Sequence, residues 1–304
     1  MIPSLDNLIV TVNWLTRQKL DRNWNTERFP KATRIQPYSR IYFPVAGRGT
    51  VEYLGRKYEL VPGRILLVPA FAEAKCFCPG HLEKYWCHFN ASFGNNSPDI
   101  FALNRDCIYL PVEDRQFLTQ LFDRLIRLSV RTGSVEQFEF NAGMKMLLSR
   151  FLEKVAWTES GDMLSVFTRL LIFIHEHLDT ELTLKKLADF TGICPSHLSH
   201  RFHEKMGMRL FEYITVHRMY KAMFLLREKQ YSIGEISDLT GFSNISVFSK
   251  SFKRHTGYSP VEFRKYFTSM PAAVHVPSSF SDPEIFMLHA KKQLRSALNA
   301  RRSG

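Results

Sequence analysis

One sequence pattern occurs twice in the C-terminal half of this chain. The first copy has Leu184, Leu187, Thr191-Gly192, Leu198, Phe202 and Gly207, and the second has Ile233, Ile236, Thr240-Gly241, Phe248, Phe252 and Gly257. The offset between the copies is 49 residues from Gly192 to Gly241 and 50 residues from Gly207 to Gly257. On either side of the first glycine, apolar residues recur at three- or four-residue spacing, which indicates helices. The pattern therefore predicts two copies of a helix, a glycine turn and a second helix.

Two helices joined by a glycine-containing turn are typical of a helix-turn-helix, whose second helix enters the DNA major groove. In the second helices, the apolar residues are expected to face the core. The side chains that point away from the core are expected to contact double-stranded DNA: Ser196, Ser199, His200, His203, Asn244, Ile245, Ser246, Ser249, Lys250, Lys253 and Arg254. Lys253 and Arg254 suit phosphate better than base edges.

The segment between the two copies, residues 210–229, predicts one long helix. Its apolar stripe consists of Phe211, Ile214, Met219, Ala222, Met223 and Leu226. About 20 residues at 1.5 Å each span about 30 Å, close to the roughly 34 Å between successive major grooves on one face of DNA. The formal net charge of the chain is +12, and residues 163–267 carry 15 Lys and Arg against 10 Asp and Glu. Such an excess favours phosphate binding.

The N-terminal half predicts a small sheet domain followed by two helices. Short apolar-rich runs at 38–45, 50–54, 57–60, 64–69, 74–78 and 84–93 are separated by Gly and Pro, which suggests a barrel or jelly roll. Residues 112–130 predict a helix with Phe117, Leu121, Leu125 and Leu128 on one face, and residues 136–157 a helix with Met144, Leu147, Leu148, Phe151 and Val155 on one face. We expect these stripes to carry a homodimer contact. The alternative is that both pack on the barrel.

The fold class predicted is α+β multidomain, with a separate core in each domain. We expect a sheet-rich domain with the dimer contact at residues 1–160, a DNA-binding domain at 161–267 and an extension at 268–304 that contains a basic helix at 282–302. The polar residues 158–162 are the expected linker. No apolar run approaches the roughly 20 residues of a membrane helix. The N-terminal residues lack a signal peptide pattern, and the five cysteines suggest no disulfide framework. We therefore expect a cytoplasmic protein with no membrane partner.

Residues 166–267 resemble the DNA-binding domain of the AraC/XylS family of bacterial transcription regulators. The resemblance is carried by Arg218 and by residues 241–243, 248–253, 257–260 and 263–264, which read Gly-Phe-Ser, Phe-Ser-Lys-Ser-Phe-Lys, Gly-Tyr-Ser-Pro and Phe-Arg. The family commonly has Tyr where His197 stands and Arg where His200 stands. A histidine replaces a bidentate guanine contact with single hydrogen bonds.

Residues 35–93 resemble the cupin-like effector domain found in many such regulators, through Gly47-Arg48-Gly49, Pro62-Gly63 and Trp86-Cys87-His88. The resemblance implies that residues 1–160 form an effector-binding and dimerisation domain, with a small-molecule effector in the barrel, often a sugar. A neutral, hydroxyl-rich ligand needs aromatic faces and a few polar groups. The expected effector contacts are Trp24, Arg40, Tyr42, Tyr85, Trp86 and His88. Tyr42 shares a face with Arg40, and Trp86 shares one with His88. Which face lines the interior stays open at this point.

An enzyme fused to a DNA-binding module is the alternative from another class. Cupin enzymes hold a metal through a His-x-His cluster, and residues 69–78 contain no such motif. The residues Cys76, Cys78, His81, Cys87 and His88 match no usual zinc spacing. We therefore predict no catalytic residue, no cofactor and no metal. The predicted function is a ligand-responsive activator of genes for sugar or other small-molecule metabolism, acting with RNA polymerase. A repressor of the same type remains the second possibility.

Overall fold

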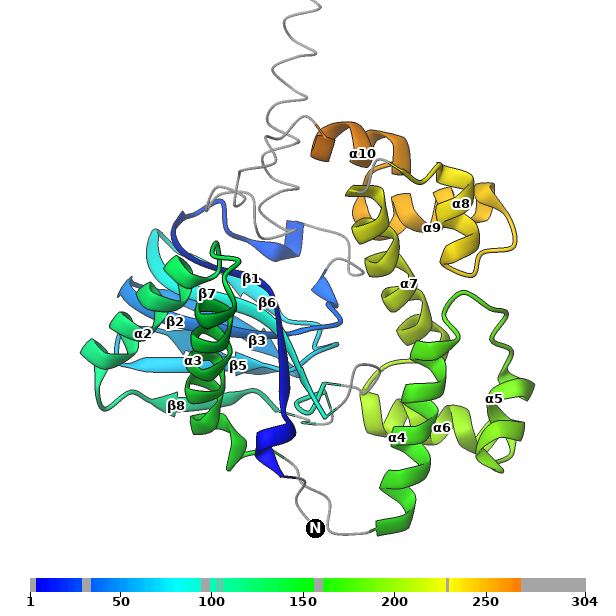
Figure 1. Ribbon diagram of the computed structural model, residues 1–304, viewed down its shortest axis with the longest axis horizontal. Helices are drawn as coiled ribbons and strands as arrows, with labels where there is room; N and C mark the ends of the chain where they lie inside the picture. The colour runs from blue at the N-terminus through cyan, green and yellow to red at the C-terminus, as the bar shows by residue number, and fades with distance from the viewer. Residues whose placement is uncertain are drawn as a thin grey trace, which may run out of the picture.

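The computed structural model describes residues 4–28, 34–93, 99–102, 104, 106–155, 161–227 and 230–268. A sheet-rich N-terminal domain lies beside a helical C-terminal domain (Figure 1). In this part of the chain no helix is long and apolar enough to cross a membrane. The predicted linker at 158–162 lies mostly outside the described residues, and its last two residues begin the first helix of the C-terminal domain. The extension from residue 269, with the predicted helix at 282–302, lies outside them entirely.

The N-terminal domain contains two antiparallel sheets. The larger has the strand order β1-β7-β2-β5-β8, built from β1 (Ile9–Asp21), β7 (His81–Ser92), β2 (Ser39–Gly47), β5 (Arg64–Val68) and β8 (Ile108–Pro111). The smaller has the order β4-β3-β6, built from β4 (Arg56–Leu60), β3 (Gly49–Tyr53) and β6 (Lys75–Phe77). The six predicted strands are confirmed. Sequence reasoning missed β1 and β8, which form the two edges of the larger sheet. The short 3-10 helices Leu5–Asn7 and Thr26–Arg28 flank β1.

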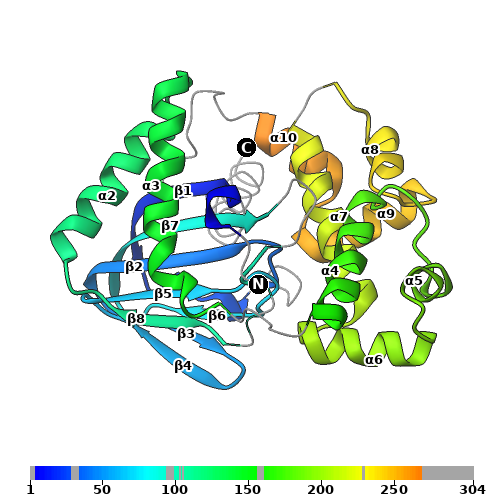
Figure 2. The same cartoon turned by 60° about the horizontal axis from the view of Figure 1, so that its bottom comes forward.

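The larger sheet has a different core on each face. One face looks toward the smaller sheet, and the core between them includes Tyr42 and Trp86 from the larger sheet with Val51 and Leu60 from the smaller one. The helices α2 (Arg115–Leu128) and α3 (Ser134–Leu152) cover the other face (Figure 2). Because side chains alternate along a strand, neighbouring residues of β2 and β7 belong to different cores.

The predicted stripes of α2 and α3 pack on the sheet and not on a second copy of the chain. α3 buries Met144, Leu147, Leu148 and Phe151, as expected. α2 buries Leu118, Phe122, Leu125 and Leu128, so its predicted stripe is displaced at two positions. Phe117 is 41% exposed and donates its amide to the capping carboxylate of Asp114. The buried residues of these stripes therefore pack on the sheet, as in the alternative, and a dimer contact in residues 112–157 stays a prediction.

The C-terminal domain is built around one central helix, α7 (Leu210–Arg227). α4 (Gly161–Glu176), α5 (Leu184–Thr191) and α6 (Pro195–Met206) lie at its first half, and α8 (Ile233–Leu239), α9 (Ile245–Thr256) and α10 (Pro260–Thr268) lie at its second half (Figure 1). The helices of both predicted repeats are confirmed. The stripe of α7 is wider than predicted, since Tyr213 and Val216 are buried, while Phe211 is 46% exposed.

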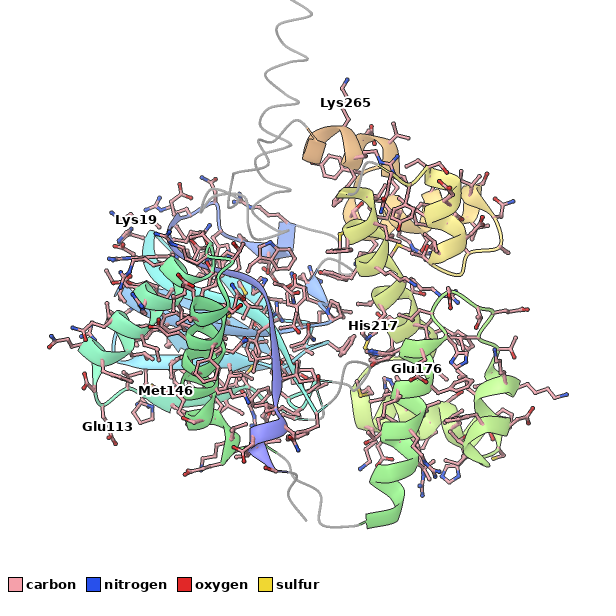
Figure 3. All side chains as sticks on the ribbon, in the orientation of Figure 1. Lys19, Glu113, Met146, Glu176, His217 and Lys265 are labelled. Atoms are coloured by element: carbon pink, nitrogen blue, oxygen red, sulfur yellow. The ribbon has the colours of Figure 1, made fainter. Side chains whose placement is uncertain are left out.

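Each domain has its own core, as predicted, and one core of the C-terminal domain also includes a few residues of the N-terminal domain. Ile35, Ala70, Phe71 and Ala102 belong to the same buried cluster as the apolar residues of α4, α5, α6 and the first half of α7. The Phe71 ring, on the loop between β5 and β6, lies 4.5 Å from the Tyr213 ring and 5.0 Å from the His217 ring. Figure 3 shows His217 on the side of α7 that faces the N-terminal domain. Phe71 has a φ of 63°, a conformation that costs a non-glycine residue free energy.

Candidate functional site

Caps and glycines give the first helix-turn-helix its shape. The Thr183 hydroxyl accepts a hydrogen bond from the Lys186 amide (3.1 Å) at the start of α5. α5 ends at Gly192, whose φ of 68° is the left-handed conformation that glycine adopts without steric cost. Pro195 lies in the first turn of α6, where a missing N–H leaves no hydrogen bond unmade. α6 therefore leaves the turn in a defined direction.

The second helix-turn-helix uses different caps for the same purpose. Ser232 and Glu235 form a capping box at α8, with N–H···O distances of 3.1 Å to the Ser232 hydroxyl and 2.7 Å to the Glu235 carboxylate. At the start of α9, the Asn244 side-chain oxygen accepts from the Ser246 amide (2.6 Å) and the Val247 amide (3.4 Å). Its side-chain NH₂ is therefore the part of Asn244 that remains available to a partner outside the chain.

Arg218 on α7 joins the two motifs. Its guanidinium donates to the Leu178 carbonyl (2.9 Å) and the Thr180 carbonyl (2.6 Å), which lie between α4 and α5. A Cβ added at Gly241, in the turn of the second motif, would lie 2.3 Å from the Leu178 oxygen and 2.6 Å from Arg218 Nη2. The turn of the second motif therefore packs directly on this clamp, and any side chain there would push the two motifs apart.

The residues predicted to contact DNA lie on the open faces of α6 and α9. Ser199 and Ser249 are half-buried and the others are exposed, whereas Leu198, Phe202, Phe248 and Phe252 are buried. The structure brings them together as two groups, one at each end of α7. Sequence reasoning left out two neighbours on these faces, exposed His197, whose Nε2 accepts from Arg201 Nε (2.8 Å), and Val247, which is 53% exposed. Their position outside the apolar spacing was the available sign.

Most of the predicted effector contacts gather between the two sheets. Across β2 and β7, Arg40 lies opposite His88, and Tyr42 lies opposite Trp86. These residues point toward the smaller sheet, and Trp24 packs beside Tyr42 with ring centroids 6.1 Å apart. None of the five is more than 3% exposed. The structure thus identifies the face that was open at the level of sequence.

Tyr85 does not belong to this group. Its hydroxyl donates to Asp123 of α2 (2.6 Å), and its ring stacks on Phe122 at 5.2 Å, so it lies on the helix-covered face. Lys84 takes its place on the interior face and is fully buried. Its ammonium nitrogen lies 3.8 Å from the centre of the Tyr42 ring and 4.4 Å from that of Trp24. The two-residue spacing from Trp86 could have identified Lys84 from the sequence.

The interior contains polar atoms without partners. Both ring nitrogens of His88 and the indole nitrogens of Trp24 and Trp86 are buried with no hydrogen-bond partner among the described residues. Burial, together with the nearby charges of Arg40 and Lys84, holds the pKa of His88 well below its usual 6.5, so the imidazole is neutral. Buried polar atoms of this kind are costly unless something binds them.

The comparisons with known proteins agree with this two-part arrangement. Residues 187–266, which hold Arg218 and the second helices of the two motifs, α6 and α9 (the recognition helices), match a family model described as a helix-turn-helix domain. The chain is 27% identical to the arabinose operon regulatory protein of Escherichia coli K12, over 72% of this chain and 78% of that protein. It is 23% identical to the Msm operon regulatory protein of Streptococcus mutans, over 86% of this chain and 94% of that protein. Residues 187–266 thus form a helix-turn-helix domain, and most of the chain is similar to transcription regulators of the AraC/XylS type.

Solved structures agree with the two-domain fold of this chain. ToxT from Vibrio cholerae O395 superposes with a TM-score of 0.52 at 13% sequence identity, covering 87% of this chain and 100% of that chain. ToxT with a bound unsaturated fatty acid, from Vibrio cholerae strain SCE256, gives a TM-score of 0.53 at 14% identity, over 86% and 96% of the two chains. Within the described ranges, no group of three or more His, Cys, Asp or Glu side chains is arranged to hold a metal ion.

Proposed function

We propose that this regulator binds DNA through α6 and α9 in two successive major grooves, and that an effector in the N-terminal domain controls this binding. The single observation that supports the proposal most is the clamp of Arg218 and Gly241, which fixes the two recognition helices relative to each other. α7 has 18 residues, which corresponds to a length of about 27 Å. This is close to the separation of successive major grooves. The exposed faces of α6 and α9 supply the DNA contacts named above, with Lys253 and Arg254 on phosphates.

The test is footprinting of the full-length chain on DNA fragments selected by the protein from random sequence. We expect two protected segments whose centres lie about 10 base pairs apart. The logarithm of the affinity is expected to fall linearly with the logarithm of salt concentration. A single protected segment, or binding that does not respond to salt, would contradict the proposal. Transcription with purified RNA polymerase then separates an activator, which we propose, from a repressor.

The proposed effector site is the interior group of Trp24, Arg40, Tyr42, Trp86 and His88, with Lys84 added. It combines aromatic faces with buried polar atoms that lack partners, as small-molecule sites do. The related arabinose and lactose operon proteins, by their names, act on genes of sugar use, and we propose a related metabolic role here. An effector that prefers one arrangement of the two domains would shift the population toward it. The role is that of a regulator and not of an enzyme.

A homodimer is proposed through the outer face of α3. Val135 (76% exposed), Phe138 (75%) and Met146 (49%) lie within one arc of this helix, because their spacings of three and eight residues bring them to the same side. Figure 3 shows Met146 on the outside of the N-terminal domain, away from the C-terminal domain. Exposed apolar side chains that share one face are typical of an interaction surface. This face is distinct from the buried stripes that the sequence suggested.

A further inference from the structure

We propose that the effector of this regulator is a small anion, whose carboxylate or phosphate group binds between Arg40, Lys84 and His88 in the interior of the N-terminal domain. This inference rests on the effector-binding function proposed above and adds the chemical class of the ligand. It departs from the neutral ligand that the sequence suggested.

The first argument is the kind of polar atom that the interior presents. The indole nitrogens of Trp24 and Trp86 can only donate, and one nitrogen of neutral His88 must also donate. None of these has a partner among the described residues. The acceptors without a described partner near them are fewer, namely the other nitrogen of His88 and the Gln18 side-chain oxygen. A sugar hydroxyl both donates and accepts, whereas a carboxylate or phosphate only accepts. The surplus of donors therefore fits an anion better.

The second argument is the charge of the interior. Arg40 is 1% exposed and Lys84 is fully buried, and both are close enough to His88 to disfavour its charged form. Within the described residues the buried carboxylate is Asp99, and its oxygens already accept from the Ser39 hydroxyl (2.8 Å) and the amides of Ala91 (2.8 Å) and Phe101 (2.9 Å). The electric field at His88 therefore includes the charges of both Arg40 and Lys84. Away from water, this field attracts an anion strongly.

The third argument is the geometry of the donors. Lys84 is held over the faces of Tyr42 and Trp24, which fix an ammonium group by cation–π attraction. Arg40 Nη2 donates to the Ala72 carbonyl (2.9 Å), which orients the guanidinium. The Trp86 and His88 rings lie beside each other with centroids 4.5 Å apart, so they offer a face to the carbon skeleton of the ligand. The donors are therefore positioned before any ligand arrives, and this lowers the entropic cost of binding.

The cleft between the domains lies close to this group. The cleft has a volume of about 430 Å³ and is lined by Tyr53 and Phe71 among others. Tyr53 is close enough to Arg40 for the guanidinium charge to oppose the rise of the tyrosine pKa, which burial brings to about 12. Phe71 directly precedes Ala72, the residue that binds Arg40. The wall of the cleft is therefore one residue away from the proposed site.

The test is calorimetric titration of the full-length chain with matched probes at constant ionic strength. The pairs are galacturonate with galactose, glucose 6-phosphate with glucose, and benzoate with benzamide. We expect the charged member of at least one pair to bind about ten-fold tighter or more than its neutral partner. Carboxylate and phosphate are told apart by which pair responds. Lys84→Gln and Arg40→Gln should abolish the preference, and Lys57→Gln, on an exposed residue of β4, should keep it.

Three results would overturn the inference. Suppose that, in every pair that binds, the neutral probe binds at least as tightly as the charged one. The ligand is then not an anion, but the proposed effector-binding function of this interior is unaffected. If no probe binds, the effector function of this interior falls together with the inference. If Lys84→Gln and Arg40→Gln bind the anion as the unaltered chain does, the anion binds elsewhere. Arg40→Lys keeps the charge and replaces Arg40→Gln if the latter melts early. It is expected to keep the preference for the charged probe.

Discussion

Replacing Phe71 by glycine is expected to loosen the contact between the two domains. Its side chain is 7% exposed and packs between Tyr213 and His217 of α7. A buried phenylalanine reduced to alanine or less costs about 3–5 kcal/mol. Glycine also removes the strain of a φ of 63°, which stabilises by about 1–2 kcal/mol. The net loss is about 1–4 kcal/mol, and it falls on the contact between the domains.

Hydrogen exchange of the backbone amides of α7 around residues 213–217 measures this loss. A change of about 1–4 kcal/mol corresponds to exchange faster by a factor of about 5 to 700, since every 1.4 kcal/mol is ten-fold. Leu54→Gly is the matched control, because Leu54 has a φ of 49° and is 69% exposed. It changes the backbone in the same way without removing a buried ring, so α7 should exchange as in the unaltered chain. Equal exchange in Phe71→Gly and Leu54→Gly would refute the reasoning.

Four further predictions concern other parts of the molecule. Lys250→Ala should weaken DNA binding, by about 1–3 kcal/mol at a single base position if Lys250 reads a base and uniformly on all sequences if it contacts phosphate. Gel shifts on a set of mutated operators distinguish these two cases. Unchanged binding would show that Lys250 is not in the interface. Phe138→Glu should give a folded monomer in sedimentation, whereas an unaltered chain that is already monomeric at micromolar concentration contradicts the dimer. Arg218→Ala should weaken binding to DNA with two half-sites more than binding to DNA with one half-site, because the variant loses the hydrogen bonds to the Leu178 and Thr180 carbonyls. Equal losses of affinity would show that these bonds do not set the spacing between α6 and α9. Burial lowers the pKa of His175 from 6.5 to about 4, so between these pH values the unfolded chain binds a proton that the folded chain does not. The free energy of unfolding, measured by urea titration, should therefore fall by about 3 kcal/mol from this residue as the pH falls from about 6.5 to 4, and no further below pH 4. A His175→Gln chain with the same acid sensitivity would contradict the assignment.

The helical domain could be predicted from the sequence because its rules are local. The glycines at 192 and 241 and the apolar residues around them repeat, and both copies fold as expected. β1 was not predicted because it is an edge strand that buries few of its residues. Apolar and polar residues therefore alternate only weakly along its sequence. On α2 the apolar residues Phe117, Leu118, Leu121 and Phe122 form two adjacent pairs, so the sequence does not say which member of each pair is buried. The orientation of the helix on the sheet decides this, and it buries Leu118 and Phe122.

The candidate effector site was only partly predictable for a related reason. Alternation along β2 and β7 paired Arg40 with Tyr42 and Trp86 with His88, but it could not say which face would be covered by α2 and α3. Once the helices cover the face of Tyr85, Lys84 must lie on the other. The contact of Phe71 with α7 joins two segments more than 140 residues apart in the sequence. No local sequence pattern predicts such a contact.

The loop between β5 and β6 links the two halves of the regulator by adjacent residues. Ala72 binds Arg40 of the proposed effector site, and Phe71 packs on α7, which holds the recognition helices. An effector that binds Arg40 would therefore act, through Ala72, on the same short loop that contacts α7. If effector and DNA affinities are coupled here, thermodynamics requires the coupling to be reciprocal. Operator DNA must then change the affinity for the effector by the same factor by which the effector changes the affinity for the operator. Binding to operator DNA would thus change the effector concentration at which this protein responds.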